Sequence, residues 1–183
     1  MILIALGANL PSAAGPPRAT LEAALSAIAA RGIAVPARSP WYRAPAYPPG
    51  SGPEFVNGAA VLAGPSAPEA VLADLLAVER ELGRSRGLRW GARVCDLDLL
   101  AFGDRVLPDA GTMRAWMALG DRAGDMAAPE RLILPHPRLQ ERAFVLVPLA
   151  DVAPRWVHPV LGRSVAEMLE ALSPEAAAGI ARL

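Results

Sequence analysis

The sequence predicts an α/β (α+β) fold, a ferredoxin-like βαββαβ sandwich with extra C-terminal helices and a loop insertion. Apolar runs typical of strands alternate with two stretches of helical periodicity, and a glycine closes each helical stretch. The two middle strands follow one another without a helix between them, as in a hairpin. The chain has 183 residues, 53% of them apolar, so we expect residues 1–183 to form a single domain.

The elements of this fold can be placed along the first hundred residues. Pro36 lacks a main-chain N–H, which predicts that its strand lies at an edge or contains a bulge. Ser66 to Glu69 has the pattern of a capping box with proline at the helix start. The expected elements are a strand over 1–6, a helix over 18–31, strands over 33–43 and 55–62, a helix over 68–82 and a strand over 94–102.

The remaining residues are expected to add helices to this core. Residues 109–128 form the insertion, in which bulky apolar side chains recur at helical spacing and predict a short helix over the body or the site. Residues 138–149 also have a helical pattern. Ser164 to Glu167 is a second capping box, so we expect residues 164–183 to form a helical tail.

Composition excludes several classes of function. The chain has 18 basic and 18 acidic residues and no lysine, so it contains neither a P-loop lysine nor a Schiff-base lysine. A net charge of zero argues against a nucleic-acid partner. The longest apolar stretches, such as 143–150, are far shorter than the roughly 18 residues of a membrane span. Met1 continues into an apolar strand without a basic leader, so we expect a cytoplasmic protein with no membrane partner.

Asp96 and Asp98 are the first candidates for chemistry. They flank Leu97 in a predicted strand, so both carboxylates leave the same face. A solvated strand face would also explain them. The leucines around them indicate a mostly buried strand, where two close carboxylates need a cation. With one cysteine and two histidines in the whole chain, a hard ion such as Mg²⁺ fits better than zinc.

Arginines gather immediately upstream of these aspartates. They can be a solvated helix end, or they can bind phosphate oxygens, for which the guanidinium fork is suited. Trp90 lies in the same glycine-containing segment, which we expect to be a mobile loop able to fold over a site. The cluster comprises Arg80, Arg84, Arg86, Arg89 and Arg93.

A histidine and two aromatic residues complete the candidate site. His136 lies between two prolines with Arg131, Arg138 and Arg142 nearby, where it is either structural or able to donate to a phosphate. His158 has no such neighbours and is interpreted as structural. The aromatic residues can be core residues, or they can form a slot for a flat heterocycle whose edge an asparagine reads. The residues of that slot are Phe55, Asn57 and Phe144.

Seven motifs occur in the order of one known family. They are Ala5-Leu6-Gly7-Ala8-Asn9-Leu10, Tyr42-Arg43-Ala44-Pro45, Phe55-Val56-Asn57, Glu79-Arg80-Glu81-Leu82-Gly83-Arg84, Arg89-Trp90-Gly91-Ala92-Arg93, Asp96-Leu97-Asp98-Leu99, and Leu134-Pro135-His136-Pro137-Arg138 with Glu141-Arg142-Ala143-Phe144. Through them the chain resembles the 6-hydroxymethyl-7,8-dihydropterin pyrophosphokinase family of folate biosynthesis.

The resemblance implies a monomeric, ATP-dependent pyrophosphokinase, a diphosphotransferase. Such an enzyme transfers pyrophosphate from MgATP to the hydroxymethyl group of the pterin and releases AMP. The implied catalytic residues are Arg84, Arg93, Asp96, Asp98 and His136, with two Mg²⁺ held by Asp96 and Asp98. The implied ATP-binding residues are Glu79, Arg84, Arg93, Leu99, Arg131, His136 and Arg142. The implied pterin-binding residues are Ala44, Pro45, Phe55, Asn57 and Phe144, and Trp90 would seal the loop.

The chain departs from the family pattern at several positions. Phe55 replaces a common tyrosine, which keeps the stacking ring, and Ala44 stands where some members have threonine. Ile133 and Pro137 replace residues that are often threonine and sometimes tyrosine, so neither inherits a polar role. The segment 109–128 is longer than the usual link.

Two other classes of protein are compatible with part of this residue pattern. Another Mg²⁺-dependent nucleotidyl or phosphoryl transferase on the same scaffold would also have paired aspartates and arginines, but it would not need an aromatic slot. A small ligand sensor or RNA-binding module is the non-enzymatic alternative. The zero net charge and the lack of an aromatic RNA-binding stripe oppose it.

Overall fold

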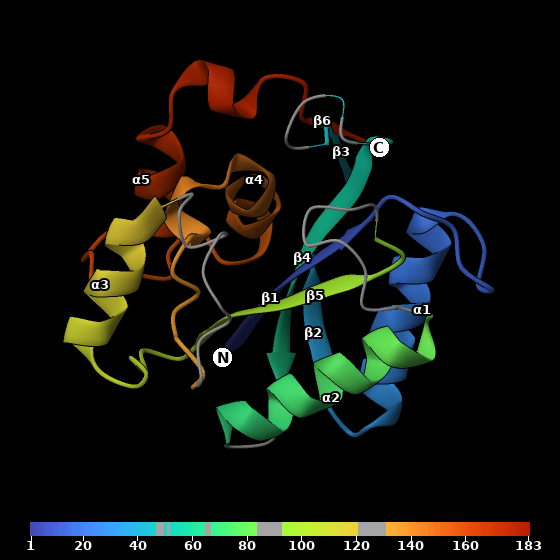
Figure 1. The fold of residues 1–183 in the computed structure, drawn as a ribbon, viewed down its shortest axis with the longest axis horizontal. Coiled ribbons are helices and arrows are strands. Elements are labelled where there is room, and N and C mark those ends of the chain that lie inside the picture. The colour runs from blue at the N-terminus through green and yellow to red at the C-terminus, as the bar shows by residue number, and fades with distance from the viewer. Residues whose placement is uncertain (47–49, 51, 65–66, 84–92, 121–130) are drawn as a thin grey trace.

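A computed structural model of the chain describes all residues except 47–49, 51, 65–66, 84–92 and 121–130 (Figure 1). An antiparallel sheet forms the centre, and helices cover both of its faces (Figure 1). Among the described residues, no helix is both long and apolar enough to cross a membrane. The strands are β1 (Ile2–Ala8), β2 (Ala34–Arg38), β3 (Tyr42–Ala44), β4 (Phe55–Ala63), β5 (Asp96–Phe102) and β6 (Ala181–Arg182).

The strand order confirms the predicted ferredoxin-like arrangement. β5, β1 and β4 are neighbours, and the far edge of β4 pairs with both β2 and β3. These two short strands together take the place of the second strand of the βαββαβ unit. They are separated by Ser39 to Trp41, and Gly58 of β4 leaves room for the Trp41 ring, because a Cβ there would lie 2.5 Å from it. As expected from Pro36, the register of β2 shifts between Ala34 and Ala37.

The first face of the sheet is covered by α1 (Pro17–Ala30) and α2 (Pro68–Glu81). The apolar faces of both helices pack with Ile4, Leu6 and Leu97 in one core cluster. α2 begins after Ala67, and Ser66, on which the predicted capping box depends, lies outside the described residues. Proline at the first helical position is confirmed, and its missing N–H removes one of the donors that a helix start leaves unpaired.

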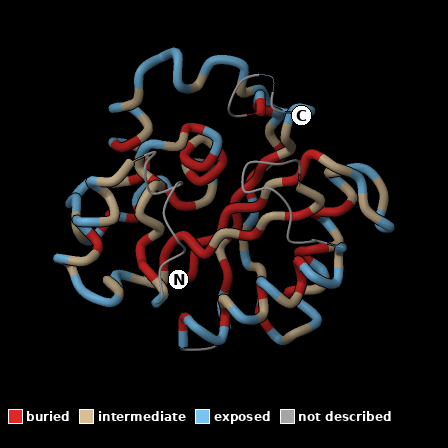
Figure 2. Tube along the Cα trace, viewed as in Figure 1, coloured by how far each residue is buried: buried red, intermediate tan, exposed pale blue. Residues whose placement is uncertain are grey.

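The second face is covered by α4 (Ala143–Val152) and α5 (Val165–Glu170) (Figure 1). Leu3 and Leu100 of the sheet pack with Leu146 and Leu149 of α4 in a second core cluster. Figure 2 shows that the buried parts of the chain concentrate along the central strands and on α4. β1 is therefore buried on both faces, which explains its uninterrupted apolar sequence.

The insertion and the C-terminal tail agree with the sequence only in part. The expected helix within 109–128 is present as α3 (Ala110–Leu119), whose Met113 is buried. It lies on the side of α4 and α5, away from α1 and α2 (Figure 1). The capping box at Ser164 is confirmed. However, the tail is not wholly helical, because after the short 3₁₀ helix η3 (Pro174–Ala177) it ends in the strand β6, which pairs with β3.

Candidate active site

A cavity of about 580 Å³ lies on the sheet face that α4 only partly covers. Its floor includes Gly7 of β1, which pairs with Asp96 on one side and with Asn57 on the other. A Cβ at Gly7 would lie 3.2 Å from Asn57 Oδ1, so a side chain there would press on the asparagine and fill the floor. The missing side chain at Gly7 thus keeps this part of the sheet open.

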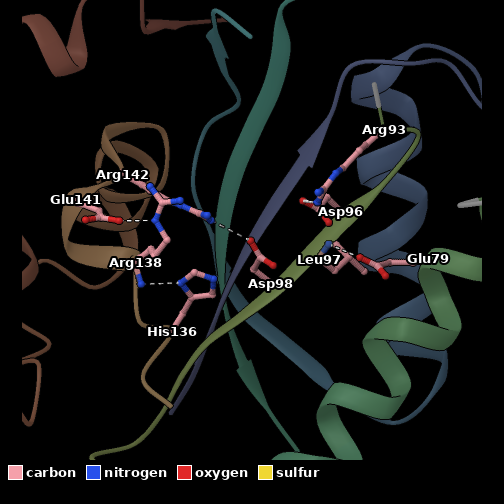
Figure 3. Close-up of polar contacts among 9 residues, drawn as sticks. All are labelled: Glu79, Arg93, Asp96, Leu97, Asp98, His136, Arg138, Glu141 and Arg142. Carbon is pink, nitrogen blue, oxygen red and sulfur yellow. Dashed lines mark hydrogen bonds and ion pairs between the residues drawn. The ribbon is translucent and has the colours of Figure 1, made fainter. Parts of the chain in front are cut away.

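Asp96 and Asp98 both line this cavity, as the strand alternation predicts. Each carboxylate is near an arginine (Figure 3). Asp96 forms an ion pair with Arg93, and the Arg142 Nη1 lies 3.8 Å from Asp98 Oδ2. The two guanidinium groups therefore offset the repulsion between the carboxylates in this state of the protein.

Glu79 contacts β5 from the sheet face that α2 covers, opposite the cavity. It is a residue of α2 with 1% of its surface exposed, and its Oε1 accepts a 2.7 Å hydrogen bond from Leu97 N–H (Figure 3). This contact fixes the main chain between the two aspartates. The ATP contact expected of Glu79 stays a prediction.

Asn9 ties the end of β1 to the segment before β5. Its Oδ1 accepts a 2.7 Å hydrogen bond from Arg93 N–H, while Arg93 C=O accepts from Asn9 N–H at 2.9 Å. Its Nδ2 donates to the carbonyl of Pro53 at 3.0 Å. Sequence reasoning used Asn9 only as part of a motif. A polar residue at the end of a buried strand was the signal for this positioning role.

His136 does not itself line the cavity but lies next to Arg138, which does (Figure 3). Its main-chain N–H donates to Leu100 C=O at 2.8 Å, and its Nδ1 accepts from Arg138 N–H at 3.1 Å. Burial, together with the charges of Arg142 and Arg138, lowers the pKa of His136 to about 3. The imidazole is therefore neutral near pH 7, and because Nδ1 accepts, Nε2 carries the proton and is a donor.

The remaining predicted ATP residues occupy different environments. Burial lowers the pKa of Arg142, and the nearby charge of Asp98 opposes this shift. The guanidinium carbon of Arg142 lies 5.7 Å from the centre of the Phe144 ring. Leu99 is buried in the core with α1 and α2, so a contact with adenosine would use its main chain, since β5 is an edge strand. Arg131 is exposed and does not line the cavity. Arg84 and Trp90 lie outside the described residues.

The other end of the cavity is apolar. All five residues predicted for this end line it: Ala44, Pro45, Phe55, Asn57 and Phe144. Asn57 is 5% exposed, and its Nδ2 has no hydrogen-bond partner among the described residues. A buried amide without a partner is costly, and a ligand with an acceptor at this position would satisfy it.

Sequence reasoning missed part of the lining. The C-terminal segment supplies Glu175, Ala176, Ala178 and Ile180 to the cavity wall. Small alanines in a tail give no sequence signal, because their place depends on the pairing of β6 with β3.

Acidic and basic groups at one end of the cavity and an aromatic slot at the other are the arrangement expected of an enzyme that transfers a phosphate-containing group to a flat acceptor. The family model for 7,8-dihydro-6-hydroxymethylpterin-pyrophosphokinase matches residues 3–154, and the chain belongs to this family of folate-biosynthesis pyrophosphokinases.

Curated relatives share this assignment. A 2-amino-4-hydroxy-6-hydroxymethyldihydropteridine pyrophosphokinase of Pseudomonas aeruginosa is 40% identical over 186 residues, which cover 100% of this chain and 96% of that protein. The protein of the same name from Synechocystis sp. is 37% identical, with 92% of this chain and 74% of that protein covered.

Solved structures show the same fold. The wild-type HPPK-DHPS of Plasmodium falciparum is similar with a TM-score of 0.61 at 12% identity and covers 92% of this chain. The chain spans only 44% of that fused protein.

Proposed function

We propose that the cavity binds MgATP and 6-hydroxymethyl-7,8-dihydropterin side by side and transfers pyrophosphate from the first to the hydroxymethyl group of the second. One observation carries the proposal. A single cavity joins the paired carboxylates Asp96 and Asp98 to an apolar slot in which the Asn57 amide has an unsatisfied donor. The first end suits a metal-bound polyphosphate and the second suits a flat heterocycle with acceptors on its edge.

The aspartates fit magnesium. They project from one face of β5 into the cavity, and among the described residues no group of three or more His, Cys, Asp or Glu side chains forms a protein-only metal cage. Mg²⁺ commonly takes one or two carboxylates and completes its shell with water and phosphate oxygens. Asp96 and Asp98 would hold two Mg²⁺, which neutralise triphosphate charge when bound.

Arginines and one histidine would position the triphosphate. Arg93 and Arg142 lie next to the aspartates, and when the carboxylates turn to a metal, both guanidinium groups become available to phosphate oxygens. His136 offers its Nε2–H as a neutral donor, since its pKa of about 3 keeps it uncharged. Arg84, Arg131, Glu79 and Leu99 complete the proposed ATP-binding set, with Trp90 sealing the loop.

The pterin would occupy the apolar end. Phe55 and Phe144 provide stacking faces, Asn57 provides an amide for the heterocycle edge, and the main chain at Ala44 and Pro45 lies on the same wall. In this pose the hydroxymethyl group would point toward the aspartates. Its oxygen bonds to the β-phosphorus of ATP and releases its proton to water, while the bond from that phosphorus to the α-phosphate oxygen breaks, so AMP leaves. Positioning and charge neutralisation supply most of the catalysis.

Product analysis tests this function. The chain, incubated with Mg²⁺, ATP and 6-hydroxymethyl-7,8-dihydropterin, should release AMP only when the pterin is present. Formation of ADP would indicate transfer of one phosphoryl group, and pyrophosphate would indicate a nucleotidyl transferase, so either product contradicts the proposal. That residues 1–183 act as one monomeric, cytoplasmic domain stays a prediction.

A further inference from the structure

The C-terminal segment 173–183 reaches the apolar end of the cavity. It leaves α5, passes over α4 and ends beside β3 (Figure 1). This segment lies beyond residues 3–154, which the family model matches. Nevertheless it supplies four residues to the cavity wall: Glu175, Ala176, Ala178 and Ile180.

Backbone pairing holds the segment in place. In β6, Ala181 and Arg182 pair with Arg43 and Tyr42 of β3, and Leu183 N–H donates to Trp41 C=O at 2.9 Å. The contact with β3 matters because Ala44, the next residue of that strand, lines the cavity. The position of the tail is thereby tied to the strand that forms the apolar end.

The segment also packs closely on the neighbouring wall. Gly179 has a φ of +80°, and a Cβ built there would lie 3.1 Å from Pro45 Cγ. A side chain at this position would therefore press on Pro45, so the close packing of the tail here depends on glycine. Ala178 and Ile180, on either side of this contact, both line the cavity, so the contact sets the width of the slot.

We infer that segment 173–183 is a wall of the heterocycle subsite and determines the affinity for the pterin, without acting on ATP. This rests on the proposed function. At the phosphate end, the described lining residues Asp96, Asp98 and Arg93 belong to β5 and the residues before it, and Arg138 and Arg142 lie just before α4. Within the described part of the chain, β6 of the tail pairs with β3 alone. Small side chains at 176 and 178 leave room for a flat ring, and Ile180 adds apolar surface beside it.

Two tryptophan substitutions separate this role from a general effect on stability. Ala178→Trp adds a large ring to the cavity wall, whereas Ala171→Trp adds the same ring at an exposed position that does not line the cavity. Calorimetry would measure the Kd of 6-hydroxymethyl-7,8-dihydropterin in the presence of Mg²⁺ and α,β-methylene-ATP, and separately the Kd of that nucleotide. Removal of 173–183 provides a second, independent variant.

Ala178→Trp should raise the Kd of the pterin by about tenfold or more and change the Kd of the nucleotide by less than about twofold. Ala171→Trp should leave both constants unchanged, and the truncated chain should weaken pterin binding with the same selectivity. Wild-type pterin affinity in Ala178→Trp, or equal weakening of both ligands in the two altered tails, would overturn the inference. AMP release by the wild-type chain tests the underlying function separately, because it does not depend on these variants.

Discussion

At Asn57 the protein keeps a buried amide nitrogen without a hydrogen-bond partner among the described residues. Such a group costs about 1–3 kcal/mol of stability unless something satisfies it. Its neighbours on the adjacent strands, Gly7 and Tyr42, do not do so. A ligand that bonds to this amide would explain why the protein keeps it, because binding sites commonly lower the stability of the free protein.

Replacing this residue should therefore separate stability from activity. Asn57→Leu, similar in size and apolar, should leave the melting temperature unchanged or raise it, because it removes the unsatisfied polar group. The same change should raise the KM for the pterin by about tenfold, because one hydrogen-bond pair is lost. Thermal unfolding and steady-state kinetics would check both. A clear loss of stability with normal pterin KM would show that the amide is structural.

Asp98 provides the sharpest test of the metal site. Asp98→Ala should reduce turnover below detection, because it removes one of two proposed ligands and leaves Arg142 without its nearby carboxylate. Cys95→Ala is the matched control three residues away, buried on the same segment. It should keep normal kcat and lose about 1 kcal/mol of stability from the smaller side chain. An inactive Cys95→Ala enzyme, or an active Asp98→Ala enzyme, contradicts this assignment.

His158 should make stability depend on pH. Burial lowers its pKa from 6.5 to about 4, so the unfolded chain binds more protons than the folded chain between these values. The free energy of unfolding should therefore be largest above pH 6.5 and should fall as the pH decreases toward 4. His136, whose pKa is lowered from 6.5 to about 3, contributes to the same decline and extends it to about pH 3.

A substitution can isolate this contribution. The Nδ1 of His158 accepts hydrogen bonds from the main-chain N–H groups of Val160 and Leu161 at 3.2 and 3.3 Å. His158→Asn keeps an acceptor near these two groups. The variant cannot titrate in this range, so its unfolding free energy should decline less between pH 6.5 and 4, by about 2–3 kcal/mol. Denaturant unfolding at several pH values would measure the difference. Identical slopes in both proteins would refute the assignment.

At the level of elements, the sequence predicts the helices and strands that depend on a local pattern. It does not predict strands that form only when distant segments pair. The strand around Asp96 and Asp98, the helix over 110–119 and the capping box at Ser164 follow from alternation, periodicity and caps. The proline at the start of α2 also follows from the local pattern, whereas the cap expected from Ser66 lies outside the described residues. The strand β6 has only two residues, and its existence depends on β3, which is 140 residues away in the chain.

The contact of the tail with Pro45, the residue after β3, can be tested by substituting Gly179. Gly179→Ala and Gly32→Ala introduce the same methyl group at nearly the same φ, +80° and +79°. Both should lose about 1 kcal/mol of stability from the left-handed backbone. Only Gly179→Ala places a Cβ against Pro45, since nothing lies within 4 Å of a Cβ at Gly32. Only Gly179→Ala should raise the KM for the pterin. Equal pterin KM values in both variants would contradict the inference that segment 173–183 forms a wall of the heterocycle subsite.

At the level of the whole molecule, the ferredoxin-like sheet explains why the site lies where it does. One cross-strand row runs from Asp96 through Gly7 and Asn57 to Tyr42 and Arg182. It joins the Asp96 carboxylate, the open floor, the Asn57 amide and the tail on one sheet face. Strand alternation predicted the two aspartates, but no local pattern could predict the row, because register arises only when the strands pair.

The arrangement of both substrates across this row is the central claim, and a crystal structure of the complete complex tests it most directly. The protein would be crystallised with Mg²⁺, α,β-methylene-ATP and 6-hydroxymethyl-7,8-dihydropterin. Mg²⁺ should contact Asp96 and Asp98, and the pterin should lie between Phe55 and Phe144 with its hydroxymethyl group toward the β-phosphorus. A pterin bound outside this cavity, or magnesium held without either aspartate, would contradict the account.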